Sequence, residues 1–210
     1  MIRILLVDDH SVVREGLKKI LEKEPDIKVS GEAGNSDEVL KFIKNKDCDI
    51  VILDINLPGR SGLDIVKDIK KFNNNIKILV LSIYPEYSFA FKAHKLGVSG
   101  YLTKDVTTEE LLKAIRKINN GRKYVSEILA ERLASRIDQS EVKQVHEKLS
   151  SREFQILLLI GKGKSLTKIS EELFLSYNTV YTYRNRILEK MGMNSNAELI
   201  HYLIKNNLLD

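Results

Sequence analysis

The sequence is poor in several residue types that would define its class. Its 210 residues include no tryptophan, three prolines, four scattered histidines and a single cysteine, Cys48. One cysteine excludes an internal disulfide framework and favours a reducing compartment, the cytoplasm. With so few cysteines and histidines, a zinc cluster is not expected.

Long hydrophobic runs are also missing. No apolar stretch approaches the roughly 20 residues that are needed to cross a bilayer. The first apolar run ends at Asp8, which predicts that the N-terminus is not a signal peptide. We therefore expect no membrane partner.

Charge of one sign is not concentrated in any part of the chain. The net charge is +5, and residues 149–210 carry eight basic and six acidic side chains. This balance favours a nucleic-acid partner only weakly. The length suits two domains, and the 43% hydrophobic content can build a core in each.

Short apolar runs alternate with helical patterns over residues 1–121. The runs predict buried strands at 2–7, 27–31, 50–53, 76–81 and 100–102. Between them, apolar residues recur at helical spacing, as in Val13, Leu17 and Ile20. Five strand–helix pairs predict an α/β fold, a doubly wound five-stranded parallel sheet with helices on both faces.

The pattern changes after residue 121. Residues 122–148 predict a connecting helix, from the spacing of Ile128, Leu129, Leu133 and Ile137, followed by a polar linker. From residue 149 onward the spacing predicts four short helices, the first capped by Ser151 and the third spanning about 177–191. Residues 149–210 are thus predicted to form a small all-α domain.

Polar residues follow four of the predicted strands, and the carboxyl ends of parallel strands meet at one edge of a sheet. Three carboxylates in one crevice are tolerated around a hard divalent cation such as Mg²⁺, which also takes a phosphate oxygen. A nearby lysine and hydroxyl can hold the other phosphoryl oxygens, so the crevice suits an acyl phosphate on a central aspartate. The residues concerned are Asp8 and Asp9, Asp54 and Asn56, Ser82, and Lys104.

Each of these residues also has an ordinary explanation. An aspartate after a strand usually caps a turn or a helix. Ser82 alone fits a loop hydroxyl, and Lys104 alone fits a solvated charge. The prediction therefore depends on the combination at four strand ends.

The segments "ILLVDDH", "VILDINLPGRSGLDIV", "ILVLS" and "GVSGYLTKD" together resemble the receiver domain of response regulators, over residues 1–121. The resemblance implies that Asp54 accepts a phosphoryl group from a sensor histidine kinase. It implies that Asp8, Asp9, Asp54 and the Asn56 carbonyl bind Mg²⁺. It also implies that Ser82 and Lys104 contact the phosphoryl group, and that Tyr101 is a switch residue whose ring packs inward when Ser82 moves toward the phosphate.

A phosphatase is the rival interpretation. Phosphatases of the haloacid dehalogenase type place a second aspartate, a general acid, two residues after the nucleophile. Here that position holds Asn56, which cannot exchange the proton. We therefore expect a regulator and not an enzyme.

The second domain has a helix pair, 166–173 and 177–191, joined by a tight turn. Such a pair suits DNA binding or helical dimerisation about equally. The segments "SREFQIL", "KIS" and "SYNTV" resemble a LuxR-type helix-turn-helix domain over residues 149 to about 208, and the whole chain resembles the NarL/FixJ class. The resemblance implies that the unphosphorylated receiver can mask the DNA-reading helix, and that phosphorylation favours a homodimer on double-stranded DNA. RNA polymerase is a further candidate partner.

The segment "SYNTVYTYRNRILEK" departs from that family. Tyr181 and Asn185 stand where the family commonly carries basic residues. We expect basic side chains to contact phosphates and Thr182 and Asn185 to contact bases, while Tyr181 suits either and Tyr183 packs inward. This predicts a DNA site that depends less on guanine. The predicted DNA-binding residues are Lys168, Ser176, Asn178, Thr179, Tyr181, Thr182, Arg184, Asn185, Arg186 and Lys190.

One alternative function stays open at this point. The helical domain of a phosphorylation-controlled signalling protein could bind protein or RNA in place of DNA. A DNA-binding assay with and without a phosphodonor separates the two hypotheses.

Overall fold

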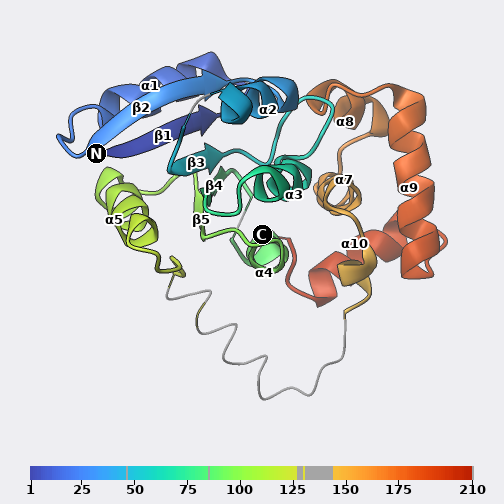
Figure 1. Ribbon diagram of the computed structural model, residues 1–210. Helices are drawn as coiled ribbons and strands as arrows, with labels where there is room; N and C mark the ends of the chain where they lie inside the picture. The colour runs from blue at the N-terminus through green and yellow to red at the C-terminus, as the bar shows by residue number, and fades with distance from the viewer. Residues whose placement is uncertain (46, 85, 127–129, 131–143, 210) are drawn as a thin grey trace. The chain divides into compact units, whose positions relative to one another are not determined.

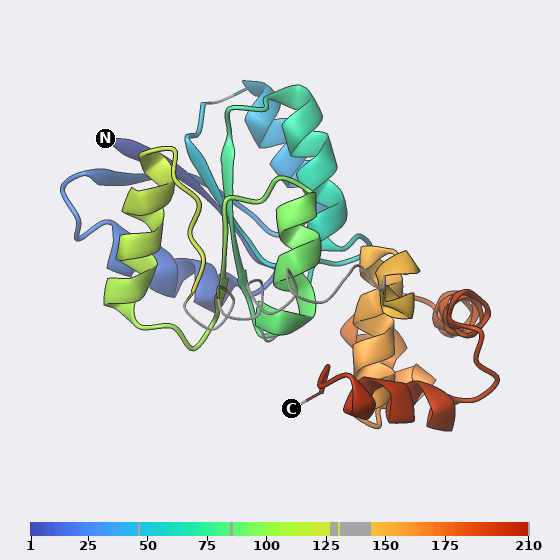
Figure 2. The same ribbon diagram turned by 90° about the horizontal axis from the view of Figure 1, so that it is seen from below.

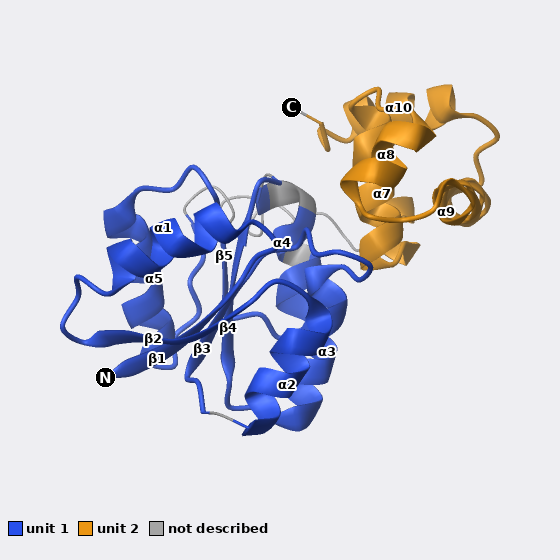
Figure 3. Cartoon of the chain, turned by 90° about the horizontal axis from the view of Figure 1, so that it is seen from above, with its two compact units in different colours: residues 1–135 blue, residues 136–210 orange. Residues whose placement is uncertain are grey.

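The structure, a computed structural model, describes all residues except 46, 85, 127–129, 131–143 and 210 (Figure 1). The chain forms two compact units, residues 1–135 and 136–210 (Figure 3). The residues that predicted the connecting helix, Ile128, Leu129, Leu133 and Ile137, lie outside the described residues. The domain boundaries proposed at 121/122 and 148/149 stay predictions.

The first unit contains the predicted parallel sheet. Its strands are β1 (Ile2–Val7), β2 (Ile27–Ala33), β3 (Ile50–Leu53), β4 (Lys77–Ser82) and β5 (Gly100–Thr103), in the spatial order β2-β1-β3-β4-β5. All four neighbouring pairs are parallel. β3 is buried along its whole length, as expected of an apolar strand covered on both faces.

Five helices cover the sheet. α1 (Ser11–Leu21) and α5 (Thr108–Asn119) lie on one face, while α2 (Ser36–Asn45), α3 (Gly62–Phe72) and α4 (Glu86–Lys95) lie on the other (Figures 2 and 3). α5 shows why these segments are helical. Thr107 caps it by accepting a hydrogen bond from the Glu110 amide, and its apolar residues Leu111, Ile115 and Ile118 are buried against the sheet. The predicted α/β architecture is confirmed.

The described residues of the second unit, 144–209, contain helices and no strand. They form a short 3₁₀ helix, η1 (Val145–Lys148), followed by α7 (Ser151–Gly161), α8 (Leu166–Glu172), α9 (Tyr177–Met191) and α10 (Asn196–Lys205). The four predicted α-helices are confirmed, whereas η1 was not predicted. Each α-helix begins after a serine whose hydroxyl accepts a hydrogen bond from the amide three residues on, namely Ser150, Ser165, Ser176 and Ser195.

The predicted cap of α7 is wrong by one residue. Ser150, and not Ser151, accepts the hydrogen bond from the Glu153 amide at 3.2 Å. The Glu153 carboxylate in turn accepts one from the Ser150 amide at 2.7 Å. This reciprocal pair requires a spacing of three residues, which only Ser150 has from Glu153.

α7 forms the centre of the second unit. α8, α9 and α10 all contact it, and nearly every residue of α7 is buried. The His146 ring from η1 stacks on Phe154 at 5.5 Å between centroids and forms a hydrogen bond with Tyr202. Among the described residues, no helix is both long enough and apolar enough to pass through a bilayer.

Candidate phosphoacceptor site and nucleic-acid interface

The predicted carboxylate site forms where the strand order reverses. From β1 the chain runs out to β2 and returns to β3 on the other side of β1, which opens a crevice at their carboxyl ends. Asp8 follows β1, and Asp54 follows β3. Lys104, after β5, places its Nζ 2.5 Å from Asp8 Oδ2 and 2.7 Å from Asp54 Oδ2. Three of the predicted residues therefore meet at one point.

Asp9 contributes a third carboxylate to the crevice. Its Oδ1 atom is buried and accepts no hydrogen bond, although His10 Nδ1 lies 2.8 Å away. Single ligand atoms of Asp8, Asp9 and His10 lie within 4.8 Å of one another. A buried carboxylate oxygen that accepts no well-aligned hydrogen bond, beside the other carboxylate oxygens, fits a hard divalent cation such as Mg²⁺.

Burial controls the charge of Asp54, whose side chain is 2% exposed. Removal from water raises its pKa to about 6, although the ammonium of Lys104 acts to lower it. Burial alone would lower the pKa of Lys104, but the carboxylates of Asp54 and Asp8 outweigh it and raise that pKa. At neutral pH the site thus holds an ionised, poorly solvated carboxylate, which is suited to nucleophilic attack.

The predicted switch residues lie beside this crevice and contact one another. The Ser82 hydroxyl is fully buried and accepts a hydrogen bond from the Tyr84 amide at 3.2 Å. The Tyr101 hydroxyl donates to the Tyr84 carbonyl at 2.9 Å, and its ring is fully buried. Burial raises the pKa of Tyr101 well above its ordinary range. The ring therefore already occupies the inward position while Ser82 still binds the Tyr84 amide, and Tyr84 links the two residues. The expected coupling between an inward ring and a displaced Ser82 stays a prediction.

Sequence reasoning missed two residues of this site. His10 directly follows the aspartates, and its amide donates to Asp8 Oδ1 at 2.9 Å. Gly62 begins α3, where an added Cβ would lie 2.0 Å from the Asp54 carbonyl oxygen. The sequence signal for Gly62 was its place shortly after the phosphoacceptor strand, but the close approach becomes visible only in the fold.

The segment after α5 forms hydrogen bonds with other elements of the first unit. The Tyr124 amide donates to the Ser99 carbonyl at 2.9 Å, and its hydroxyl donates to Glu110 at 2.6 Å. Two residues on, the Ser126 hydroxyl donates to the carboxylate of Glu86, the first residue of α4. The connection to the second unit therefore starts in direct contact with α4 and α5.

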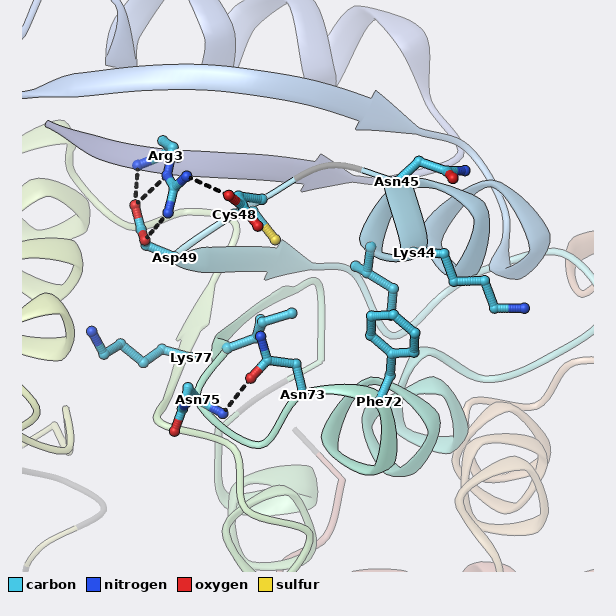
Figure 4. Close-up of a pocket in the computed structure, with 12 residues that line it drawn as sticks. Arg3, Lys44, Asn45, Cys48, Asp49, Phe72, Asn73, Asn75 and Lys77 are labelled. Atoms are coloured by element: carbon cyan, nitrogen blue, oxygen red, sulfur yellow. Dashed lines mark hydrogen bonds and ion pairs between the residues drawn. The ribbon is translucent and has the colours of Figure 1, made fainter.

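A cavity of about 570 Å³ lies at the opposite, amino edge of the sheet (Figure 4). Its two carboxylates are both engaged by Arg3, which forms hydrogen bonds with Asp49 at 2.9 and 3.1 Å and with Asp47 at 3.2 Å. Lys77 in the same lining donates to the Asn119 carbonyl at 3.0 Å. Burial raises the pKa of Cys48 to about 11, so little thiolate exists at neutral pH. We assign no chemistry to this cavity.

The predicted DNA-binding residues fall into two groups. The residues of the first group are exposed and form no ion pair with any described residue. They lie on α8, on α9 or at the cap of α9: Lys168, Ser176, Asn178, Tyr181, Thr182, Asn185 and Arg186. Thr179 is partly buried, and its hydroxyl is 2.8 Å from that of Ser176. The Thr182 hydroxyl donates to the Asn178 carbonyl at 2.8 Å, which leaves its methyl group as the outer part of the side chain.

Arg184 and Lys190 form the second group, because both are held by neighbouring side chains. Arg184 donates to Asn196 at 2.9 Å and to Asn185 at 3.1 Å. Lys190 Nζ lies 2.7 and 2.8 Å from the carboxylate oxygens of the buried Glu153. Their predicted phosphate contacts stay predictions, and Lys190 would have to leave Glu153 to make one.

Replacing Lys190 with methionine is expected to destabilise the second unit by about 1 kcal/mol, because the pair is half exposed on the lysine side. Burial acts to raise the pKa of Glu153, but hydrogen bonds from Lys190 and Ser150 hold it below its ordinary value. The pair thus stabilises the fold above the unfolded pKa, and its contribution is lost as pH falls through the lower folded pKa.

Hydrogen exchange of peptides from α7 and α9, at pH 7 and at low pH, measures this effect. Arg186→Met is the matched control, since Arg186 is exposed and should leave exchange unchanged. An equal protection in the Lys190→Met variant and the wild type at pH 7 would show that the ion pair is not structural.

The chain matches two protein families. Residues 4–116 match the response regulator receiver domain, and residues 147–203 match the bacterial regulatory proteins of the luxR family. The response regulator UvrY of Escherichia coli K12 is 36% identical over 209 residues, which cover 99% of this chain and 96% of UvrY. The response regulator GacA of Pseudomonas aeruginosa is 34% identical over 211 residues, which cover 100% of this chain and 99% of GacA.

A solved structure of a two-component response regulator, RcsB, in complex with DNA is also similar. It has 26% sequence identity and a TM-score of 0.60, and the match covers 96% of this chain and 97% of that chain. The similarity thus extends over both units in sequence and in fold.

Proposed function

Since this chain belongs to the NarL/FixJ class of two-component response regulators, we propose that phosphorylation of Asp54 controls sequence-specific DNA binding by α9. The class consists of regulators and not of enzymes. The observation that carries the proposal is the Asp54 carboxylate itself, which is 2% exposed at the strand crossover and 2.7 Å from Lys104 Nζ.

Phosphoryl transfer needs a nucleophile and groups that bind the phosphoryl oxygens. An Asp54 oxygen attacks phosphorus, and the phosphorus–nitrogen bond of the phosphohistidine on the sensor kinase breaks as the new phosphorus–oxygen bond forms. Mg²⁺, held by Asp8, Asp9, Asp54 and the Asn56 carbonyl, would neutralise the charge that gathers there. Lys104 then turns from the Asp54 carboxylate to a phosphoryl oxygen.

The switch residues give a route from this site to the second unit. A Ser82 hydroxyl that moves to the phosphoryl group gives up its hydrogen bond with the Tyr84 amide. Tyr84 also holds Tyr101, so the loop before α4 has to rearrange. α4 begins at Glu86, which accepts the hydrogen bond from Ser126 at the start of the connection. Phosphorylation thus biases two states of the receiver that differ where the connection begins.

The second unit supplies the DNA contacts. A helix-turn-helix places the N-terminal residues of its second helix at base edges in the major groove. Lys168 and Arg186 are exposed and suit phosphates, whereas Thr182 and Asn185 suit base edges. A homodimer would bind paired half-sites. We propose that the protein acts in the cytoplasm, where it would meet both DNA and the kinase, and that RNA polymerase is a further partner at promoters.

Footprinting on DNA enriched by the protein tests the proposal. With Mg²⁺ and acetyl phosphate we expect at least a tenfold gain in affinity over the unphosphorylated protein, about 1.4 kcal/mol. The logarithm of the affinity should fall with the logarithm of the salt concentration, with a slope that corresponds to only a few phosphate contacts, because few basic groups are exposed. Equal protection of DNA with and without the phosphodonor contradicts the switch. Preference for RNA over duplex DNA contradicts the DNA assignment.

A further inference from the structure

The second unit exposes three aromatic side chains that lie close together in the sequence, and two of them are in ring contact. Phe174 is 67% exposed, Tyr177 51% and Tyr181 47%. All three lie within eight residues, in the turn before α9 and in its first two turns. Single exposed apolar residues are ordinary, but an adjacent exposed pair such as Tyr177 and Tyr181, with Phe174 in the turn before it, marks a candidate contact surface. We call these three residues the aromatic ridge.

The ridge has a defined geometry. The rings of Tyr177 and Tyr181 are 6.5 Å apart between centroids with 17° between their planes, so they stand side by side. Ser176 fixes the start of the helix by accepting a hydrogen bond from the Thr179 amide at 3.1 Å. Phe174 has a φ of 53°, in the left-handed region that is unfavourable for a bulky residue. Its ring gains little from burial to offset that cost.

The position of the ridge points to one kind of ligand. Its residues occupy the end of α9 from which a recognition helix reads base edges. In the major groove, the apolar group that a base pair presents is the C5 methyl of thymine. Two of the nearby polar atoms are already engaged, since the Thr182 hydroxyl binds the Asn178 carbonyl and the Asn185 oxygen accepts from Arg184. The Thr182 methyl group and the Asn185 amide nitrogen still suit base edges beside the rings. Lys168 and Arg186 remain exposed for the flanking phosphates.

We propose that the aromatic ridge reads thymine methyl groups in the major groove of the target site. Phe174, Tyr177 and Tyr181 would then determine sequence specificity. The faces of their rings would contact the thymine methyl groups, where charged side chains would otherwise contact bases. The inference rests on the proposed function, because it requires that α9 enters duplex DNA.

Deoxyuridine substitution tests the inference directly, since it removes the methyl group and keeps the base pairing. The full-length protein, phosphorylated with acetyl phosphate, first selects a duplex site from a random pool. Each thymine in that site is then replaced in turn. We expect two or three positions per half-site where affinity falls about fourfold for each lost methyl group.

Ridge variants assign the effect to the rings. Tyr177→Ala and Tyr181→Ala should each lose the discrimination between thymine and deoxyuridine at the position that the missing ring contacts, whereas Tyr181→Phe should keep it because it keeps the ring. Ile204→Ala, which truncates another exposed apolar side chain of the same unit at 61% exposure, should change nothing. Circular dichroism of each variant confirms that α9 is still folded.

The outcomes separate this inference from the proposed function. No binding to any duplex overturns both. Two results would contradict thymine reading by the aromatic ridge while the proposed function still holds. One is selective duplex binding with equal affinity for thymine and deoxyuridine sites, and the other is a selected site without thymine. Tighter binding of single-stranded DNA also overturns thymine reading, because the rings would then stack on bases.

Discussion

Replacing Asp54 with asparagine is expected to make DNA affinity independent of a phosphodonor. Asparagine has the same shape and can still accept the hydrogen bond that the Asn56 amide donates to Asp54 at 3.1 Å. It has no carboxylate to form an acyl phosphate, so the phosphorylated state is not reached. The wild type should gain at least tenfold in affinity with acetyl phosphate, about 1.4 kcal/mol, and the variant should gain none.

Titration of labelled target DNA with both proteins measures the difference. Mass spectrometry of the intact chain shows at the same time whether a phosphoryl group is attached. Asp49→Asn is a matched control, since Asp49 lies at the other edge of the sheet and binds Arg3. A phosphodonor response that persists in Asp54→Asn would mean that another residue is the acceptor.

Replacing Gly62 with alanine is expected to produce the largest loss of stability among the glycine positions near the site. The new Cβ would lie 2.0 Å from the Asp54 carbonyl oxygen and 3.0 Å from the Asp54 carbonyl carbon and Ile55 Cα. These are backbone atoms of the phosphoacceptor loop, which cannot rotate aside as a side chain can. We expect a loss of about 2–4 kcal/mol and slower phosphorylation, because α3 and Asp54 have to separate.

Two other glycines are matched controls for Gly62. Gly16 lies within α1 with no atom within 4 Å of an added Cβ, so Gly16→Ala should stabilise the protein by about 0.5–1 kcal/mol. Gly59 has equal space but a φ of 73°, so Gly59→Ala should cost about 1 kcal/mol. Urea unfolding followed by circular dichroism compares all three, and a Gly62→Ala variant as stable as the wild type would contradict the close contact.

The sheet and its carboxylate crevice were predictable because their signals are local. Most of the strands are short apolar runs, although β2 (IKVSGEA) is mixed, and Asp8, Asp54 and Lys104 directly follow strand ends that parallel topology brings to one edge. The burial of these strands follows directly from their apolar residues. The resemblance to receiver domains added the individual roles, which are proposals for this chain.

Features that depend on partners far along the chain were not predictable in this way. Lys190 was expected at phosphates, but it pairs with Glu153, which lies 37 residues earlier. Tyr124 stands in a polar segment without periodicity, yet it packs in the core of the first unit.

The short helix η1 was missed for a different reason, its length. η1 has four residues, too few for a hydrophobic period to show.

The attachment of Tyr124 and Ser126 has a consequence for how the phosphoryl site and the connection are coupled. Ser126 donates to Glu86 at the start of α4, and Tyr124 donates to Glu110 in α5. α4 is the helix that follows the strand of Ser82, and α5 is the helix that follows Lys104. The two helices that anchor the connection are therefore the ones reached first from the two side chains that would contact the phosphoryl group, so the signal need not pass through the core of the sheet.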